Sequence, residues 1–212
     1  MFYDLVKRLI DIVGATLGII LLSPIFIIVA IAIKLDSQGP ILADIPQRVG
    51  SHGNIFRMYK FRSMIRNAHN LLRRDPKFKK LYEEYIKNSY KLEDDPRITK
   101  IGKFLRKTSV DELPQLVNVL KGEMSLVGPR AYYPDELETQ TQRFPRTKQY
   151  VSTLLAVKPG ITGPWQVSGR SKIDFEQRVR MDASYAIKRS LMYDLRIMFR
   201  TIPAVFKGEG AQ

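Results

Sequence analysis

Asp111 and Glu112 are the two adjacent side chains of this sequence best suited to chemistry, and their position allows a structural or a reactive role. Ser109 and Glu112 have the spacing of a capping box, in which both side chains only bond helix amides. Pro114 argues against Ser109 as the cap, because the proline would become the fifth helical residue and break an internal hydrogen bond. With Asp111 as the cap, Pro114 occupies the third helical position, where its missing N–H is tolerated. We therefore expect both carboxylates at a helix N-terminus, where oriented amides also favour a bound phosphate.

The composition excludes several kinds of active site. The 212 residues include no cysteine, so a thiolate nucleophile and a cysteine-bound zinc are excluded. The two histidines, His52 and His69, lie far apart in the sequence and suggest neither a zinc site nor a serine triad. The net charge of +14 indicates a polyanionic partner. Nucleic acid fits poorly because no module for reading it is recognisable, which leaves an anionic membrane surface or a phosphorylated substrate.

An apolar segment near the start predicts attachment to a membrane. Residues 12–33 read IVGATLGIILLSPIFIIVAIAI and carry no charge. They are long enough to cross a bilayer, and too long and uninterrupted for a typical signal peptide. Ser23 and Pro24 stand near the midpoint, where a proline bends a helix.

The distribution of charge bears on how this segment sits in the membrane. All but two of the 35 Lys and Arg residues follow the apolar run, and Lys7 and Arg8 precede it. Positive flanks prefer the cytoplasm, so both ends are expected there. A re-entrant hairpin satisfies that rule and a straight span does not. The residues alone leave both a re-entrant helix and a simple bitopic anchor open.

The rest of the chain predicts a mainly α fold with a minor β component. We divide it into residues 1–36, the membrane helix and its flank, and residues 37–212, a second domain. Between residues 71 and 91, apolar side chains recur at helical spacing among lysines, which suits packing on the domain or lying on an anionic membrane. Asp174 is a suitable N-cap for a helix to about Ser190. Residues 191–208 suit either a core helix or one at the bilayer interface.

Several motifs in a fixed order resemble the bacterial sugar transferase family, the monotopic polyprenyl-phosphate phosphoglycosyl transferases. The resemblance covers nearly the whole chain. The occurrence of all these motifs in one order is far more specific than any single motif. The motifs are Ser23-Pro24, Tyr59-Lys60-Phe61-Arg62-Ser63-Met64, Asp95-Pro96-Arg97-Ile98-Thr99, Asp111-Glu112-Leu113-Pro114-Gln115 and Met124-Ser125-Leu126-Val127-Gly128-Pro129-Arg130.

This resemblance implies a topology and a reaction. It implies a re-entrant helix broken at Ser23-Pro24 with both ends in the cytoplasm. A catalytic domain with amphipathic interfacial helices would lie on the cytoplasmic face of the bacterial inner membrane. The expected reaction moves a sugar-1-phosphate from a UDP-sugar to undecaprenyl phosphate and releases UMP. It would start an O-antigen, capsule or exopolysaccharide.

The resemblance also implies roles for individual residues. Asp111 would be the nucleophile that forms a covalent phosphosugar intermediate, and Glu112 would position Mg²⁺ or take a proton. Asp111 and Glu112 would together be the ligands of that Mg²⁺. Four basic residues match positions that would hold phosphate groups, namely Lys60, Arg62, Arg106 and Arg130.

Two departures from the family pattern affect the surroundings of the site. Ala131 replaces a common proline, and Pro164 replaces a common leucine. The sequence does not name the sugar. A homodimer would be consistent with paired amphipathic surfaces near a membrane. The alternative function is a membrane-tethered basic module that binds anionic lipid or a partner without turnover.

Overall fold

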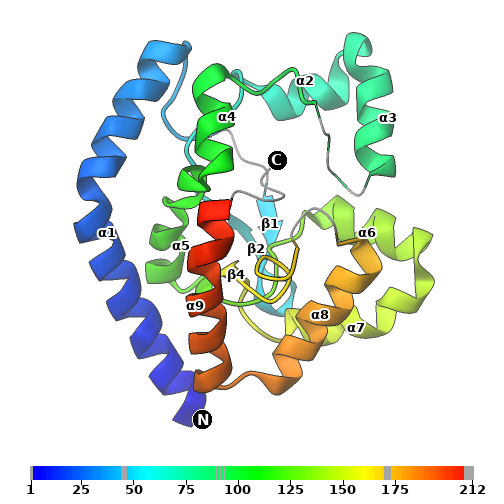
Figure 1. Ribbon diagram of the computed structural model, residues 1–212. Helices are drawn as coiled ribbons and strands as arrows, with labels where there is room; N and C mark the ends of the chain where they lie inside the picture. The colour runs from blue at the N-terminus through cyan, green and yellow to red at the C-terminus, as the bar shows by residue number, and fades with distance from the viewer. Residues whose placement is uncertain are drawn as a thin grey trace.

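Helices dominate the computed structural model, which describes residues 2–43, 47–88, 90, 92, 94–169 and 173–207 (Figure 1). This content confirms the predicted mainly α fold with a minor β component. The α-helices are α1 (Phe2–Asp36), α2 (Ala68–Arg74), α3 (Lys79–Lys87), α4 (Lys100–Lys107), α5 (Gln115–Lys121), α6 (Pro134–Arg143), α7 (Lys148–Leu155), α8 (Phe175–Lys188) and α9 (Leu191–Lys207). Short 3-10 turns are η1 (Ser51–Gly53), η2 (Pro76–Phe78), η3 (Val110–Glu112) and η4 (Pro145–Thr147).

Two small sheets lie among these helices. Strand β1 (Gln47–Val49) pairs antiparallel with β2 (Ile55–Arg57), and β3 (Ser125–Val127) pairs parallel with β4 (Gly160–Thr162). The parallel pair brings together two motifs that are far apart in the sequence. The loop after β3 therefore lies beside the chain at β4.

Helix α1 continues through Pro24 as one α-helix, so the expected interruption at Ser23-Pro24 is not present. A proline at position 24 leaves the carbonyl of Ile20 without its usual helical donor. The Ser23 hydroxyl donates to this carbonyl at 2.8 Å. The serine thus supplies the hydrogen bond that the proline removes, which explains how the helix continues.

The first turns of α1 are fixed to the rest of the molecule by polar side chains. Arg8 donates to the carbonyl oxygens of Val119 and Leu120 at the end of α5, at 2.6 and 2.8 Å. Asp11 is buried and accepts from the Ser125 hydroxyl at 3.0 Å and from the Leu126 amide at 2.9 Å. These bonds hold this end of α1 against α5 and β3.

The second half of α1 packs on the same domain through apolar side chains. Val29 and Ile33 form a buried cluster with Phe61 and Leu105. In Figure 1, α1 runs along one side of the molecule from bottom to top, beside α4 and α5. Both halves of the helix therefore contact one domain.

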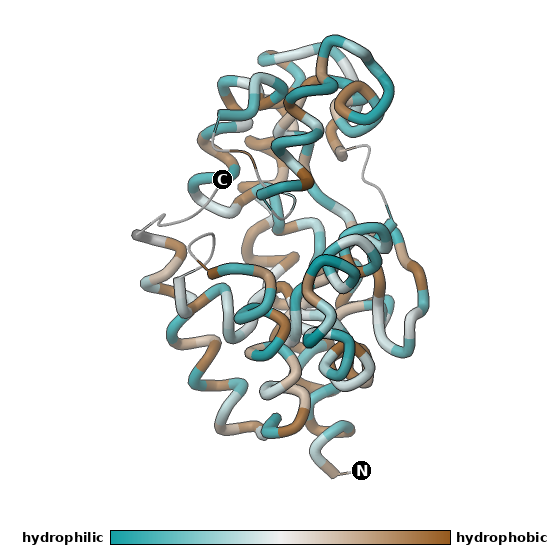
Figure 2. The backbone as a smooth tube through the Cα atoms, turned by 90° about the vertical axis from the view of Figure 1, so that its right-hand side faces the viewer, coloured by the Kyte–Doolittle hydropathy of each residue, from teal (hydrophilic) through white to brown (hydrophobic). Residues whose placement is uncertain are grey.

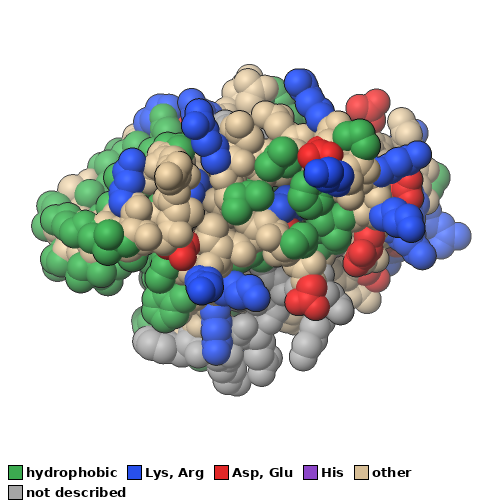
Figure 3. Space-filling model, turned by 90° about the horizontal axis from the view of Figure 1, so that it is seen from above, with side chains coloured by type: hydrophobic (Ala, Val, Ile, Leu, Met, Phe, Trp, Pro, Cys, Tyr) green, Lys and Arg blue, Asp and Glu red, His purple; other side chains and the backbone are tan. Residues whose placement is uncertain are grey.

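The outer face of α1 is apolar and open. The helix is long and apolar enough to cross a membrane, and only 11% of its most apolar stretch is buried, unlike the core helix of a soluble protein. Hydrophobic side chains gather on the left flank in Figure 3, where α1 lies in Figure 1. This exposure fits membrane attachment.

The predicted C-terminal helices are both present. Asp174 caps α8 by accepting from the Gln177 amide at 2.8 Å. Helix α9 packs through Ile197, while Phe199 and Ile202 are exposed. One side of α9 thus belongs to the core, as one of the two expectations has it, and another side is apolar and open; its position at the bilayer interface stays a prediction.

Helices α2 and α3 form a lobe at the top of the molecule, as Figure 2 shows. A turn at Asp75 separates them, in which Asp75 accepts from the Lys77 amide at 3.0 Å. Apolar and polar positions alternate along these helices in Figure 2. The lobe packs its apolar side around Leu72 and Tyr85.

Candidate active site

Asp111 and Glu112 both lie in the turn η3, between α4 and α5. Helix α5 begins at Gln115, with Pro114 as the residue before it. The prediction that Asp111 caps this helix is therefore wrong. Pro114 has no N–H to donate, and the first amides that bond at this end of α5 are those of Leu116, to the carbonyl of Leu113, and Val117, to the carbonyl of Pro114, both at 3.1 Å and both after the turn η3. The carboxylates belong to that turn and do not stand at the N-terminus of α5.

Lys60 joins the two carboxylates. Its Nζ lies 2.6 Å from Glu112 Oε1 and 3.8 Å from Asp111 Oδ2. The side chain of Asp111 is 8% exposed and that of Glu112 is 37% exposed, so Asp111 is the sheltered member of the pair. A shared cation offsets the repulsion between two neighbouring negative groups.

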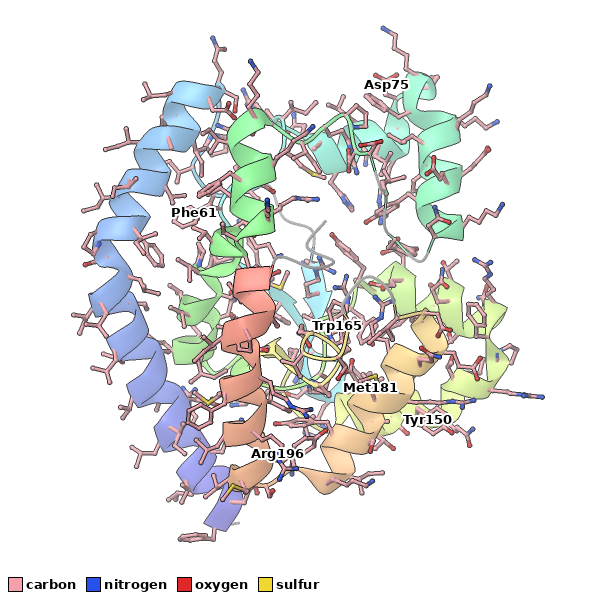
Figure 4. The ribbon with its side chains drawn as sticks, in the orientation of Figure 1. Phe61, Asp75, Tyr150, Trp165, Met181 and Arg196 are labelled. Atoms are coloured by element: carbon pink, nitrogen blue, oxygen red, sulfur yellow. The ribbon has the colours of Figure 1, made fainter. Side chains whose placement is uncertain are left out.

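A main-chain bond fixes Lys60 beside the turn. The amide of Phe61 donates to the carbonyl of Asp111 at 2.9 Å. The Phe61 ring also packs edge-on against Phe26 of α1, with centroids 5.3 Å apart. Figure 4 shows Phe61 between α1 and α4. The apolar helix therefore contacts the residue next to Lys60.

Arg106 and Arg130 extend the positive charge around the pair. Arg106 Nε donates to the Ser63 hydroxyl at 3.0 Å, and both arginines line the same cavity as Asp111. The guanidinium carbon of Arg130 lies 5.2 Å from the ring centroid of Trp165, which Figure 4 shows near the middle of the molecule. The fold thus brings Lys60, Arg106 and Arg130, three of the four basic residues expected to bind phosphate, to the cavity that contains the carboxylates.

Arg62, the fourth of these residues, lines the same cavity, but its side-chain nitrogens are bonded to the chain after α1, and its expected binding of substrate phosphate stays a prediction. Its Nε donates to the carbonyl of Pro40 at 2.6 Å, and its Nη1 and Nη2 donate to the hydroxyl and carbonyl of Ser37 at 2.6 and 2.8 Å. All three nitrogens are therefore used to hold the chain after α1. Arg97 is similarly structural, because it forms two bonds to Asp95.

The cavity beside the carboxylates has a volume of about 1380 Å³. Apolar side chains of α1 and α9, including Leu22, Ile25 and Val205, form part of its wall. Other parts of the wall carry Arg48 and Tyr133, where the Arg48 guanidinium carbon lies 3.2 Å from the ring centroid. A ligand with both a charged and an apolar portion fits such a lining.

Burial raises the pKa of Asp111 to about 6. Lys60 and Arg106 oppose this shift by stabilising the ionised form, while Glu112 adds to it. Asp111 is therefore largely ionised near neutral pH, yet it is more basic than an exposed aspartate. A sheltered, ionised carboxylate is a suitable nucleophile.

The raised pKa predicts an effect of pH on stability. In protein without divalent cations, folding should become less favourable as pH rises from about 4 to about 6, because the unfolded chain releases the Asp111 proton first. The free energy of unfolding of Asp111→Asn does not fall in this way. Between pH 4.5 and pH 7.5 it should therefore rise by on the order of 2 kcal/mol relative to that of the wild type. Thermal unfolding of both proteins at the two pH values measures the difference. An equal difference at both values would contradict the assignment.

The carboxylate pair also fits the predicted Mg²⁺. This ion prefers oxygen ligands and is often held by one or two carboxylates together with substrate phosphates. Asp111 and Glu112 provide such oxygens. Across the described residues, no group of three or more His, Cys, Asp or Glu side chains could hold a metal alone. The donors therefore suit a cation that binds together with a phosphorylated substrate.

Sequence reasoning missed three buried charged residues behind Arg130. Glu136, Arg178 and Asp182 are each fully buried. Arg178 and Asp182 share a face of α8 with the buried Phe175 and Val179, at the spacing of core positions. For Arg178 and Asp182, the signal in the sequence was the presence of charged residues at core positions of an amphipathic helix.

Comparisons with known proteins identify relatives over nearly the whole chain. The profile of a family described as bacterial sugar transferase matches residues 2–208. An uncharacterized sugar transferase of Haemophilus influenzae is 45% identical over 98% of this chain and 42% of its own length. Undecaprenyl-phosphate galactose phosphotransferase of Salmonella typhimurium is 44% identical over 97% of this chain and 41% of its own. Exopolysaccharide production protein ExoY of Sinorhizobium fredii is 40% identical over 97% of this chain and 87% of its own length. The chain thus spans less than half of the first two relatives and most of the third.

Proposed function

Because the chain belongs to the bacterial sugar transferase family, we propose that it moves a sugar-1-phosphate from a UDP-sugar to undecaprenyl phosphate and releases UMP. The observation that carries this proposal is the sheltered Asp111 beside Glu112 and Lys60, in a cavity that Arg106 and Arg130 also line. The name of the Salmonella relative, with undecaprenyl phosphate and galactose in it, supports the choice of substrates. The product would begin an O-antigen, capsule or exopolysaccharide.

Asp111 acts as the nucleophile in this proposal. One of its oxygens attacks the β-phosphorus of the UDP-sugar, the bond to the bridging oxygen breaks, and UMP leaves with that oxygen. A phosphosugar remains on Asp111 as an acyl phosphate. An oxygen of undecaprenyl phosphate then attacks the same phosphorus and restores the carboxylate. One phosphoanhydride replaces another, so the reaction needs no ATP.

The neighbouring residues bind and orient charge. Lys60 holds Glu112 and Asp111 together, and Arg106 and Arg130 stabilise the phosphate oxygens of the substrate. Glu112 either positions Mg²⁺ or takes the proton of the lipid phosphate. When bound, Mg²⁺ would supply positive charge that offsets the repulsion between an anionic nucleophile and an anionic substrate.

We place the protein at the cytoplasmic face of the bacterial inner membrane. The positive flanks of the apolar run favour this side for both ends of α1. Contacts of both helix halves with one domain, through Arg8 and through Ile33, support a location of both ends on the same side. The exposed apolar faces of α1 and α9 would contact lipid, and the net charge of +14 suits an anionic surface. The homodimer stays a prediction.

Two other functions make different products. Transfer of the sugar alone would release UDP in place of UMP. A membrane-tethered module would release no nucleotide, and it does not explain why a carboxylate is buried beside a lysine in a large cavity.

Nucleotide release separates these possibilities. Protein held in detergent or nanodiscs is given Mg²⁺, undecaprenyl phosphate and a panel of UDP-sugars, beginning with UDP-galactose. We expect UMP to form with at least one donor. UDP as the product would overturn phosphosugar transfer, and no release of either nucleotide with any donor would favour the tethered module.

A further inference from the structure

Arg130 is held from behind by side chains of α8 that do not line the cavity themselves. Asp182 Oδ2 accepts from the Arg130 amide at 3.1 Å and from the Tyr132 hydroxyl at 2.9 Å. Asp182 and Tyr132 are both fully buried. The carboxylate therefore bonds directly to the backbone of the residue whose side chain faces the reaction centre.

A second contact acts on the other end of Arg130. Arg130 Nε lies 4.0 Å from Glu136 Oε1, and Arg178 Nη2 lies 3.2 Å from the same oxygen. Arg178 and Asp182 are one turn apart on α8, so one helix face reaches both the backbone and, through Glu136, the guanidinium of Arg130.

The energetic cost of this arrangement indicates that it does more than fill space. A buried carboxylate loses its hydration, and burial raises the pKa of Asp182 to about 7. An apolar residue at this helix position would avoid that cost. What an apolar residue could not provide is an acceptor for the Arg130 amide.

We propose that Asp182 is a positioning residue that fixes Arg130 toward Asp111 and Glu112 and thereby sets the affinity for the nucleotide-sugar phosphates. This inference rests on the proposed function. It assigns Asp182 no contact with substrate, because its effect passes through Arg130. Removal of the acceptor should therefore matter only while the Arg130 side chain is present.

The first experiment measures how well the backbone amide of Arg130 is protected from exchange, and it needs no catalytic reaction. Hydrogen exchange of the full chain in nanodiscs is followed in peptides that cover residues 128–133. Asp182→Ala should speed exchange there at least about tenfold, and Asp182→Asn should stay near wild type because its amide oxygen still accepts. Tyr132→Phe is the matched control, since it removes the other donor and leaves the Arg130 bond. Unchanged exchange in Asp182→Ala would overturn the proposal.

The second experiment measures how the bond between Asp182 and the Arg130 amide affects use of the UDP-sugar. Asp182→Ala should lower kcat/KM for the UDP-sugar about 10- to 100-fold, while Asp182→Asn should remain within about threefold of wild type. In an Arg130→Gln background, Asp182→Ala should cause little further loss. Equal losses in both backgrounds would show a general structural role and overturn the proposal.

Two precautions keep the outcomes distinct. Thermal unfolding is recorded for each variant, and Asp182→Ser, whose hydroxyl is too short to reach the Arg130 amide, replaces Asp182→Ala if the alanine variant does not fold. If wild-type protein releases no UMP, the proposed function fails. The exchange experiment then still decides whether Asp182 holds Arg130.

Discussion

Asp111→Asn is expected to abolish turnover, with UMP release reduced by at least about a thousandfold. The asparagine keeps the size of the side chain and is neutral, so burial does not disfavour it. It lacks the carboxylate oxygen that attacks phosphorus. The wild-type carboxylate is sheltered and lies beside Lys60. Among the described residues, Glu112 is the only other carboxylate in the same turn that could replace it.

A matched control makes this result specific. Asp75→Asn makes the same chemical change in the α2–α3 lobe, where Asp75 caps η2 (Figure 4). Asparagine is an equally good cap, so full activity is expected. Glu112→Gln should also be severely impaired. Turnover near the wild-type rate by Asp111→Asn, with folding checked by circular dichroism, would remove Asp111 from the mechanism.

Gly160→Ala is expected to destabilise the fold by more than about 2 kcal/mol and to remove activity with it. A Cβ at this position would lie 2.0 Å from the amide nitrogen of Gly128 and 2.4 Å from the carbonyl oxygen of Thr162. Both atoms are backbone and cannot rotate away. The same region carries the bonds from Gly128 N to Thr162 O and from Gly160 N to Pro129 O, at 2.9 and 2.8 Å. Relief of the clash would therefore move the loop that carries Arg130.

Gly53→Ala provides the comparison for this substitution. Gly53 has φ of +80° and no atom within 4 Å of an added Cβ, so alanine there meets backbone strain of about 1 kcal/mol and no clash. Thermal unfolding and UMP release should show a large loss for Gly160→Ala and a small loss for Gly53→Ala. Similar behaviour of the two variants would mean that close packing at Gly160 does not position the site.

The helices and their caps could be predicted where the responsible groups are near in sequence. Asp174 and the helix that follows it depend on a local side chain to amide bond. The continuation of α1 through Pro24 was mispredicted for an equally local reason, since the Ser23 hydroxyl replaces the missing donor. The rule that proline interrupts a helix does not account for a neighbouring hydroxyl.

The details of the site depended on contacts between distant segments. The turn at Asp111 is fixed by the amide of Phe61, and no pattern within residues 108–115 contains that bond. Arg62 stands only two positions from Lys60, yet its partners are Ser37 and Pro40, which membership in the same motif does not indicate. Reactive residue types could be recognised from sequence, while their individual partners required the fold.

Transfer of a ³²P label to Asp111 is the most direct test of the covalent phosphosugar intermediate. The protein is mixed with Mg²⁺ and a UDP-sugar that carries ³²P at the β-phosphorus, without undecaprenyl phosphate, and is quenched within a single turnover. We expect ³²P on the protein in a peptide that contains Asp111, release of the label on addition of undecaprenyl phosphate, and no label in Asp111→Asn. UMP formed by wild-type protein without any labelled protein, or equal labelling of the asparagine variant, would contradict this expectation.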